Sequence, residues 1–408
     1  MEDVTVSNQT IKVLILSATI GMGHWRAGEA LRKAFASRDE EIEVRHEDIL
    51  DFANPSLKEL CHKSYEQMAN SAPQLLGFLY DYSDKTFSNE THGIALERLI
   101  THGVTELIED YAPDIVISTH SLPADITSWL LCNESTKALH AVVLTDFDVH
   151  PIWLCHHYAR YFVALDETKE HLVQLGFHSE RISVTGIPID PVFELVKGQK
   201  EMRHKHGLAL TYTTILISAG GMGFGPMDEI LPSLLDLKGS NQIIAACGSN
   251  QQLRERMEEL CEERKDRSDN LVKVIGLTTE MDEYMEAADI ILGKPGGLMS
   301  SEALAKGLAF VIVSPVPGQE ERNADHLIEE GTAIRCNNMP ALTYKVNRLL
   351  HDHAKLSSMK KNALAMAHPH AAQQIAEELL EMHRSEAVNS IHPIGHKCKQ
   401  PFRFNLEL

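Results

Sequence analysis

The fold of this 408-residue chain is indicated most clearly by the stretch Asp289–Gly297, which reads DIILGKPGG. Its apolar run has the length of a buried strand and ends in a glycine turn. A short helix is predicted to follow over Leu298–Lys306, and another apolar strand over Phe310–Val313. Continuous apolar strands joined by helices are typical of a parallel sheet that is covered on both faces.

The same alternation recurs on both sides of this stretch. It predicts an α/β chain with two doubly wound, Rossmann-like domains. In the first half the predicted strands are Ile11–Leu16, Ile42–Arg45, Asp114–Ser118, Ala141–Thr145, Tyr161–Leu165 and Ile182–Thr185. In the second half they are Thr214–Ser218, Gln242–Ala246, Val272–Ile275, Asp289–Leu292 and Phe310–Val313.

The domain boundary is predicted in Gly186–Pro191, where a glycine and two prolines end a strand and begin a linker. Helices are expected over Glu194–His206 and, near the C-terminus, over Ala371–Arg384. The expected parts are a first domain over residues 10–190, a second over residues 191–371, and a C-terminal helix and tail over residues 372–408.

Composition limits the possible functions. The net charge of -20 repels nucleic acid. The seven cysteines are dispersed with no C-x-x-C pair, which is typical of reduced thiols in a cytosolic protein. Met1–Thr10 lacks the features of a signal peptide, and no apolar run is long enough to span a bilayer. Between Phe52 and Gly93, apolar and aromatic residues indicate a helical insertion that packs on the sheet or meets a membrane.

The first loop with possible chemistry is Ala18–His24, between a predicted strand and an amphipathic helix. Glycines at such a turn let backbone N–H groups approach an anion at the helix N-terminus. Arg26 stands where the dinucleotide fingerprint G-x-G-x-x-G needs glycine, so that fingerprint is absent. His24 is either a polar contact for a ligand or a surface histidine near the helix start.

The second loop is Thr145–Pro151, just past a predicted buried strand. Asp146 could accept a proton from an attacking hydroxyl there. Asp146 and Asp148 form a D-x-D pattern, but three residues are weak evidence for a metal. His150 and the nearby stretch Cys155–His157 match no zinc-binding spacing. We expect no metal.

The third loop, Ser218–Gly225, is rich in glycine and lacks the G-K-[ST] of an ATP-binding loop, so its backbone is suited to wrap a diphosphate. In the fourth block, Glu302 could bind two ribose hydroxyls or simply complement a helix dipole. Gln319 and Glu320 follow a predicted strand and are suited to pair with sugar hydroxyls.

The fourth block carries a resemblance to a known family. Gly293–Gly297, Ser301–Leu304 and Pro315–Ala324 resemble the diacylglycerol glycosyltransferases, which comprise the monogalactosyldiacylglycerol synthases and the processive diacylglycerol glucosyltransferases. Leu144–Phe147 with His150 and Trp153, and Val184–Ile189, are also similar to the family. The likeness covers about residues 11–380 and implies a GT-B fold, related to the peptidoglycan lipid-intermediate N-acetylglucosaminyltransferase.

The resemblance implies an inverting transfer of glucose or galactose from a UDP-sugar to diacylglycerol. Asp146 would be the general base, and His24 would lie by the donor diphosphate or the acceptor head group. The UDP-sugar is a co-substrate, and no cofactor or metal is implied. The implied UDP-sugar-binding residues are Gly221, Met222, Gly223, Gly296, Gly297, Glu302, Gln319, Glu320 and Asn323. The implied acceptor and membrane residues are Tyr65, Leu76, Phe78, Leu79 and Tyr80.

The expected location is the cytoplasm, with peripheral attachment to a membrane. Other readings stay open: a UDP-sugar transferase with a different lipid or small-alcohol acceptor, a UDP-sugar epimerase or hydrolase on the same fold, or an inactive sugar-nucleotide-binding protein. The choice between UDP-glucose and UDP-galactose, the number of sugars added and the oligomeric state are left open by the sequence.

Overall fold

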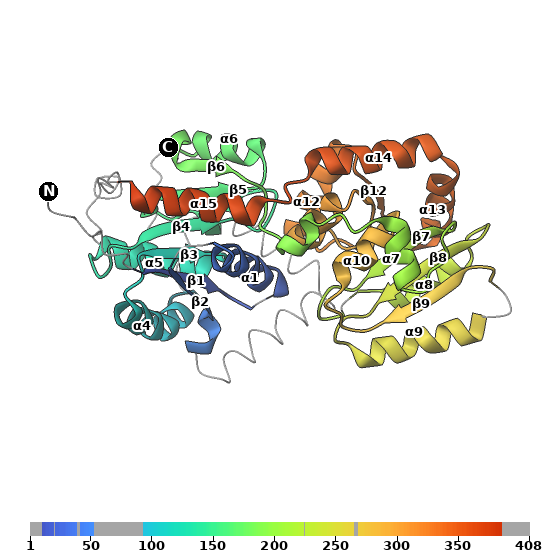
Figure 1. Cartoon of the computed structure of the whole chain (residues 1–408), viewed down its shortest axis with the longest axis horizontal. Helices are drawn as coiled ribbons and strands as arrows, with labels where there is room; N and C mark the ends of the chain where they lie inside the picture. Colours follow the sequence, from blue (N-terminus) through green and yellow to red (C-terminus); the bar gives the residue numbers. More distant parts are fainter. Residues whose placement is uncertain are drawn as a thin grey trace, which may run out of the picture. The chain divides into compact units, whose positions relative to one another are not determined.

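The computed structural model describes residues 10–19, 21–38, 41–52, 93–223, 225–264 and 268–385. The predicted insertion between Phe52 and Gly93 and the tail beyond Ser385 lie outside these residues. The described residues divide into two compact units after Pro191, and the chain returns to the first unit at His370 (Figure 1).

The first unit is built on a parallel sheet in the order β2-β1-β3-β4-β5-β6. Because β2 lies on one side of β1 and β3 on the other, the strand order reverses at β1, and such a switch point is where α/β sheets bind ligands. The strands are β1 (Ile11–Ser17), β2 (Ile42–Asp48), β3 (Ile115–Ser118), β4 (Leu139–Val143), β5 (Arg160–Val163) and β6 (Ile182–Val184).

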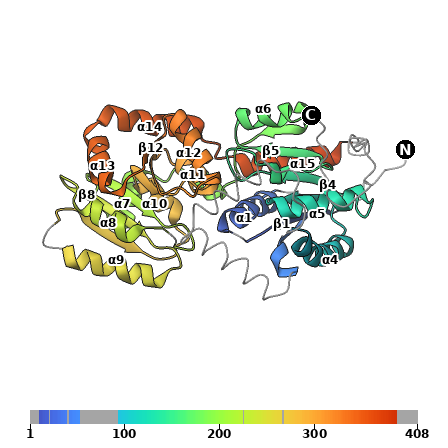
Figure 2. The same cartoon turned by 180° about the vertical axis from the view of Figure 1, so that it is seen from behind.

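Helices cover both faces of this sheet. One face packs against α1 and α15 (Figure 1), and the reverse view shows α4 and α5 on the other (Figure 2). Leu31 and Phe35 of α1 share a core with Ile375 and Leu379 of α15, which explains why the last helix belongs to the first unit. The helices are α1 (Met22–Ala36), α4 (Gly93–Tyr111), α5 (Ser121–Cys132), α6 (Asp166–Gln174) and α15 (Ala371–Arg384), with short 3-10 turns at Ile49–Phe52, Pro151–Trp153 and Ser179–Arg181.

The second unit has a parallel sheet in the order β12-β11-β10-β7-β8-β9, so its switch point lies between β7 and β10. Its strands are β7 (Thr213–Ser218), β8 (Asn241–Ala246), β9 (Leu271–Ile275), β10 (Ile290–Gly293), β11 (Ala309–Val313) and β12 (Ala333–Cys336). Its helices are α7 (Gln199–Lys205), α8 (Met227–Leu235), α9 (Gln251–Arg264), α10 (Met281–Ala287), α11 (Gly297–Ala305), α12 (Gln319–Glu329), α13 (Leu342–His351) and α14 (His353–Met366), with 3-10 turns at Pro191–Glu194 and Met339–Ala341.

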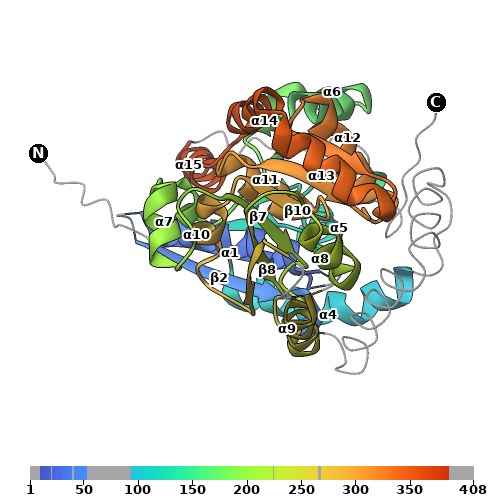
Figure 3. The ribbon, with the colours of Figure 1, turned by 90° about the vertical axis from the view of Figure 1, so that its right-hand side faces the viewer.

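One apolar core joins this second sheet to α8, α9 and α13, which follow one another along its side in Figure 3. The residues that form it alternate along β7 and β10, as expected for strands whose faces pack against different helices. The two doubly wound sheets confirm the predicted fold class.

The structure also corrects the prediction in two places. Each predicted strand is present with shifted ends, but β12 was missed, because it is a four-residue edge strand with Arg335 inside it. The helix predicted over Glu194–His206 spans only Gln199–Lys205. It begins after Gly198, whose φ of +86° interrupts any helix that arrives from Glu194.

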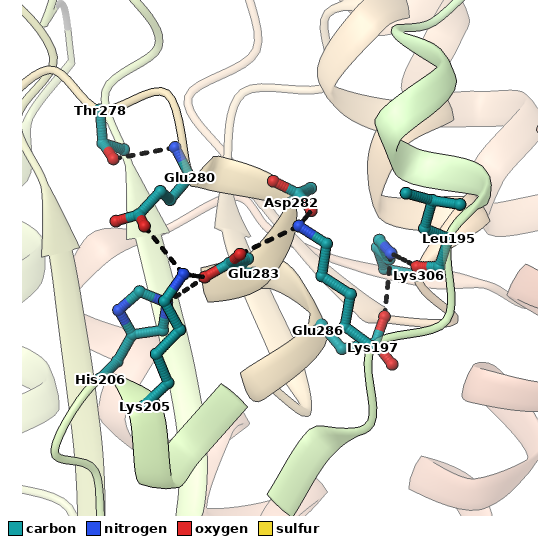
Figure 4. A network of polar contacts seen from close by, with 10 residues as sticks. All are labelled: Leu195, Lys197, Lys205, His206, Thr278, Glu280, Asp282, Glu283, Glu286 and Lys306. Carbon is teal, nitrogen blue, oxygen red and sulfur yellow. Dashed lines mark hydrogen bonds and ion pairs between the residues drawn. The ribbon is translucent and has the colours of Figure 1, made fainter. Parts of the chain in front are cut away.

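An ion-pair network joins α7 to α10 in the second unit (Figure 4). The Glu283 carboxylate accepts hydrogen bonds from Lys205 (2.6 Å), Lys197 (3.0 Å) and His206 (2.8 Å). These bonds, with that from Lys205 the largest influence, lower the pKa of Glu283 to about 2. Lys306 extends the network by donating to Glu286 and to the Leu195 carbonyl.

Candidate active site

Three strand-ending loops of the first unit converge on His24 at the switch point. The His24 Nδ1 atom lies 2.9 Å from the carbonyl oxygen of Thr119, which follows β3. The same atom lies 2.8 Å from Oγ1 of Thr145, which follows β4. The histidine itself lies in the first turn of α1, which follows β1, so tertiary structure joins residues 95 and 121 positions apart.

Burial controls the charge of His24. Desolvation lowers the pKa of its imidazole to about 4, although the hydrogen bond to Thr119 acts in the opposite direction. The ring is therefore neutral at pH 7. A neutral ring does not supply the positive charge that a diphosphate prefers.

A hydrogen-bond chain supports the loop behind His24. Glu29 accepts from His46 Nδ1 (2.7 Å), and His46 Nε2 contacts Ser17 Oγ (2.8 Å). Ser17 reaches Thr119 Oγ1 (2.7 Å), which donates to the His24 carbonyl (3.0 Å). The order Glu–His–Ser resembles a nucleophilic triad. Ser17 is fully buried, however, so the chain positions the loop and does not offer a nucleophile.

His140 provides a test of the cost of burying histidine in this sheet. Burial lowers its pKa to about 4, and its Nδ1 donates to the His157 carbonyl (2.9 Å). The unfolded chain therefore takes up a proton before the folded protein does, and stability falls as the pH drops from about 6.5 to about 4. We expect His140→Asn to reduce the slope of unfolding free energy in this window by about 1.4 kcal/mol per pH unit.

The measurement is urea unfolding at several pH values between 7.5 and 4.5. The matched control is Ser118→Ala, which removes the hydroxyl 3.1 Å from His140 Nε2 and leaves the imidazole in place. This control should lower stability while keeping the parental slope. A parental slope in His140→Asn would contradict the assignment.

The proposed base, Asp146, lies directly after Thr145, and only 6% of it is exposed. Asp148 differs from it, because its Oδ1 accepts from the Val149 N–H (2.8 Å) and lies 3.7 Å from His171 Nδ1. The second carboxylate of the D-x-D pattern is thus engaged in local contacts.

Two further groups of possible metal ligands have other partners. Burial raises the pKa of the Cys155 thiol to about 12, and its sulfur contacts the Tyr161 hydroxyl (3.2 Å), so it stays protonated. Among the described residues, His206, Glu280 and Glu283 place ligand atoms within 4.8 Å of one another. The Lys205 ammonium donates to both of these carboxylates and already supplies the positive charge.

The glycine loops of the second unit interlock at the ends of β7 and β8. A Cβ on Gly223 (φ +76°) would lie 2.4 Å from the Cys247 carbonyl, and one on Gly248 (φ +58°) would lie 2.4 Å from the Gly220 carbonyl. Asn250 donates to the Gly223 carbonyl (3.2 Å). These contacts fix the loop on its buried side. Gly221 is exposed to solvent, so its backbone is available to an anionic ligand.

The loops after β10 and β11 are also joined. Asn323 is fully buried and donates to the Pro295 carbonyl (3.1 Å), while Glu320 Oε2 accepts from the Val316 N–H (2.6 Å). Glu302 is 1% exposed and lies in the second turn of α11, which begins at Gly297. This depth weakens the reading of Glu302 as a residue that complements the helix dipole, which acts within the first turn.

The structure therefore places the predicted residues in two groups, one per unit. His24 and Asp146 lie at the strand ends of the first unit. The predicted donor residues Gly221–Gly223, Gly296–Gly297, Glu302 and Gln319–Asn323 lie after β7, β10 and β11 of the second unit. The predicted membrane residues Tyr65, Leu76, Phe78, Leu79 and Tyr80 lie outside the described residues.

Sequence reasoning missed Thr119 and His120. Both follow a predicted strand, so the rule that ligands meet the carboxyl ends of strands could have found them. His120 stacks edge-on against His24 with ring centroids 4.6 Å apart.

Comparisons with known proteins identify the family. The family model for monogalactosyldiacylglycerol (MGDG) synthase matches residues 24–189, and that for the glycosyltransferase family 28 C-terminal domain matches residues 214–375. A processive diacylglycerol beta-glucosyltransferase of Bacillus pumilus is 32% identical over 375 residues, which cover 92% of this chain and 96% of the relative. The Bacillus subtilis protein of that name is 29% identical over 379 residues, with the same coverage.

Solved structures show the same fold. MurG of Acinetobacter baumannii matches with a TM-score of 0.64 at 17% identity, over 91% of this chain and 100% of that one. The UDP-GlcNAc 2-epimerase of Neisseria meningitidis bound to UDP-GlcNAc matches with a TM-score of 0.58 at 15% identity, with the same coverage. The HepE protein of Anabaena in complex with UDP matches with a TM-score of 0.53 at 16% identity, again over 91% and 100%.

The two Rossmann-like units and the matching family models define a glycosyltransferase with the GT-B fold. Within that class, the chain belongs to the diacylglycerol glycosyltransferase family, as its resemblance in sequence indicated.

Proposed function

We propose that this enzyme transfers a hexose from a UDP-sugar to the free hydroxyl of diacylglycerol and forms a β-glycosyl diacylglycerol. The observation that carries the proposal is the 32% identity to a diacylglycerol beta-glucosyltransferase over 96% of that relative's length. Because the Bacillus relatives are glucosyltransferases, UDP-glucose is the donor we propose, ahead of UDP-galactose.

The proposed chemistry is a direct displacement with inversion. The acceptor oxygen attacks the anomeric carbon of the α-linked donor, the bond from that carbon to the diphosphate breaks, and UDP leaves. Asp146 takes the proton of the attacking hydroxyl. This role is supported by its position after β4, beside Thr145 and the His24 loop.

The proposed donor site is the strand-end surface of the second unit. The Gly221–Gly223 loop, which is exposed at Gly221, and the α11 N-terminus at Gly296–Gly297 would bind the diphosphate. Glu302 would accept hydrogen bonds from the ribose, and Gln319 and Glu320 would contact the hexose. Negative charge on the leaving UDP would then be stabilised by backbone N–H groups, without a bound metal or cofactor.

The proposed acceptor requires the enzyme to act at a membrane surface. Diacylglycerol resides in a lipid bilayer, yet no helix among the described residues combines the length and apolarity needed to cross one. We therefore propose peripheral attachment. The net charge of -20 opposes binding to an anionic surface, so the attachment should depend on apolar side chains.

The decisive test is UDP release by the purified protein from UDP-glucose and UDP-galactose, with and without dispersed diacylglycerol. We expect release that requires the lipid and is faster with UDP-glucose. Release that ignores the lipid would instead favour a hydrolase. Conversion of the donor sugar without UDP release would favour an epimerase on the same fold.

A further inference from the structure

The side chain of His46, on β2, is packed tightly behind the loop that leads to His24, and only 2% of it is exposed. Its imidazole stacks on the Trp25 indole with ring centroids 3.8 Å apart and an angle of 21° between the planes. Gly28 of α1 lies against the ring edge, where a Cβ would collide with His46 Nε2 and come within 2.7 Å of Ser17 Oγ. Glycine at position 28 therefore lets the imidazole reach Ser17.

The charge of Glu29 determines which nitrogen of this ring carries the proton. Burial opposes ionisation of Glu29, but hydrogen bonds from Arg32 and His46 lower the pKa of its carboxyl below the ordinary value. The carboxylate can only accept a hydrogen bond, so His46 Nδ1, 2.7 Å away, must carry a proton. Burial lowers the pKa of His46, although Glu29 acts in the opposite direction, and the ring is neutral at pH 7. Its Nε2 atom therefore has a lone pair.

This lone pair determines how two buried hydroxyl groups point. Ser17 Oγ lies 2.8 Å from His46 Nε2 and must donate its only hydrogen there. The Ser17 oxygen is then an acceptor for the Thr119 hydroxyl, 2.7 Å away. Thr119 has one hydrogen for two acceptors, which are Ser17 Oγ and the His24 carbonyl oxygen at 3.0 Å. The state of one imidazole thus reaches the backbone of the His24 loop.

Thr119 connects these hydroxyl groups to the candidate site. Its hydroxyl faces the His24 carbonyl, and its own carbonyl oxygen lies 2.9 Å from His24 Nδ1, so two contacts join the same two residues. His24 Nδ1 also lies 2.8 Å from Oγ1 of Thr145, the residue before Asp146. A shift of the Thr119 side chain would therefore move the His24 loop relative to the strand end that carries the proposed base.

We propose that His46 is a positioning residue for the hexose transfer. It acts on turnover through Ser17 and Thr119, which hold the His24 loop beside the strand end that carries Asp146. The buried ring is not available to a substrate, and the proposed donor site belongs to the second unit, so the affinity for UDP should not depend on His46. The inference rests on the proposed function, because turnover is its readout.

Three variants distinguish hydrogen bonding from packing. His46→Gln can donate an amide N–H to Glu29 and accept from Ser17 through its carbonyl, so it reproduces the neutral ring. His46→Leu fills much of the same space without either bond, while Glu29 keeps its bonds from Arg32 (3.1 and 3.0 Å). We expect kcat to stay within about threefold of the parental value in His46→Gln and to fall roughly tenfold in His46→Leu. Gly28→Ala should resemble His46→Leu, because its Cβ displaces the ring without removing a polar group.

The measurement is steady-state UDP release from UDP-glucose with dispersed diacylglycerol, with UDP as product inhibitor, alongside thermal melting of each variant. The expected pattern is a lower kcat in His46→Leu and Gly28→Ala with the parental inhibition constant for UDP. Equal losses of kcat in His46→Gln and His46→Leu would reduce the role of the ring to packing and overturn the proposal. Parental kcat in His46→Leu, whatever its melting temperature, would also overturn it, as would a raised inhibition constant for UDP.

The wild-type protein separates this inference from the proposed function. Wild-type protein that releases no UDP in the presence of the lipid would refute the proposed function, and the claim about turnover with it. If the wild-type protein is active, the contrary variant results refute the inference alone.

Discussion

Asp146→Asn should lower the rate of hexose transfer by about 10²–10⁴-fold, the range expected when a general base is removed. The amide has nearly the size of the carboxylate but cannot accept the proton of the attacking hydroxyl. Since Asp146 belongs to the first unit and the donor loops to the second, the affinity for UDP should not change. The measurement is lipid-dependent UDP release together with calorimetric titration of UDP.

The control for this variant stands two residues away. Asp148→Asn removes a carboxylate that accepts from Val149 and lies near His171, so it should affect local stability more than turnover. If both substitutions reduced transfer equally, the D-x-D pattern would regain its reading as a metal site. Full activity in Asp146→Asn would remove the proposed base.

The second large effect is expected at Asp289, which precedes β10. Its carboxylate accepts from Arg203 (2.7 Å), Lys360 (3.0 Å) and the Thr214 N–H (2.9 Å). Burial alone would raise the pKa of Asp289, but these three partners lower it below its ordinary value. Asp289→Ala leaves the guanidinium of Arg203, which is 5% exposed, without its anion. We expect a loss of about 3–5 kcal/mol in unfolding free energy.

The positions of the tryptophans allow this loss of unfolding free energy to be assigned to one unit. Its three tryptophans, Trp25, Trp129 and Trp153, all belong to the first unit. Tryptophan fluorescence therefore follows the first unit, while far-UV circular dichroism follows both. In urea, Asp289→Ala should shift the dichroism transition more than the fluorescence transition.

Lys360→Ala is the control. The side chain of Lys360 is 32% exposed, so its ion pair with Asp289 should contribute about 1 kcal/mol or less. A loss below 1 kcal/mol in Asp289→Ala would contradict the argument.

The fold was predictable because buried parallel strands leave a local signal. Apolar runs such as Val13–Leu16 and Ile290–Leu292 are apolar on both faces, and helices must cover them. Strands at the edge of a sheet have a weaker sequence signal, and β12 contains the charged residue Arg335. The interruption of the predicted helix at Gly198 depends on a backbone angle that composition does not reveal.

The class of enzyme and the glycine-rich loops could be recognised from the order of the amino acids, because strand-turn-helix patterns and family motifs are local. The chemical state of the residues in those loops depends on the folded protein. Whether His24 is charged depends on its burial and on its contact with Thr119. The contact of His24 with Thr119 joins residues far apart in sequence, and burial belongs to the folded core. Neither can be read from a linear pattern.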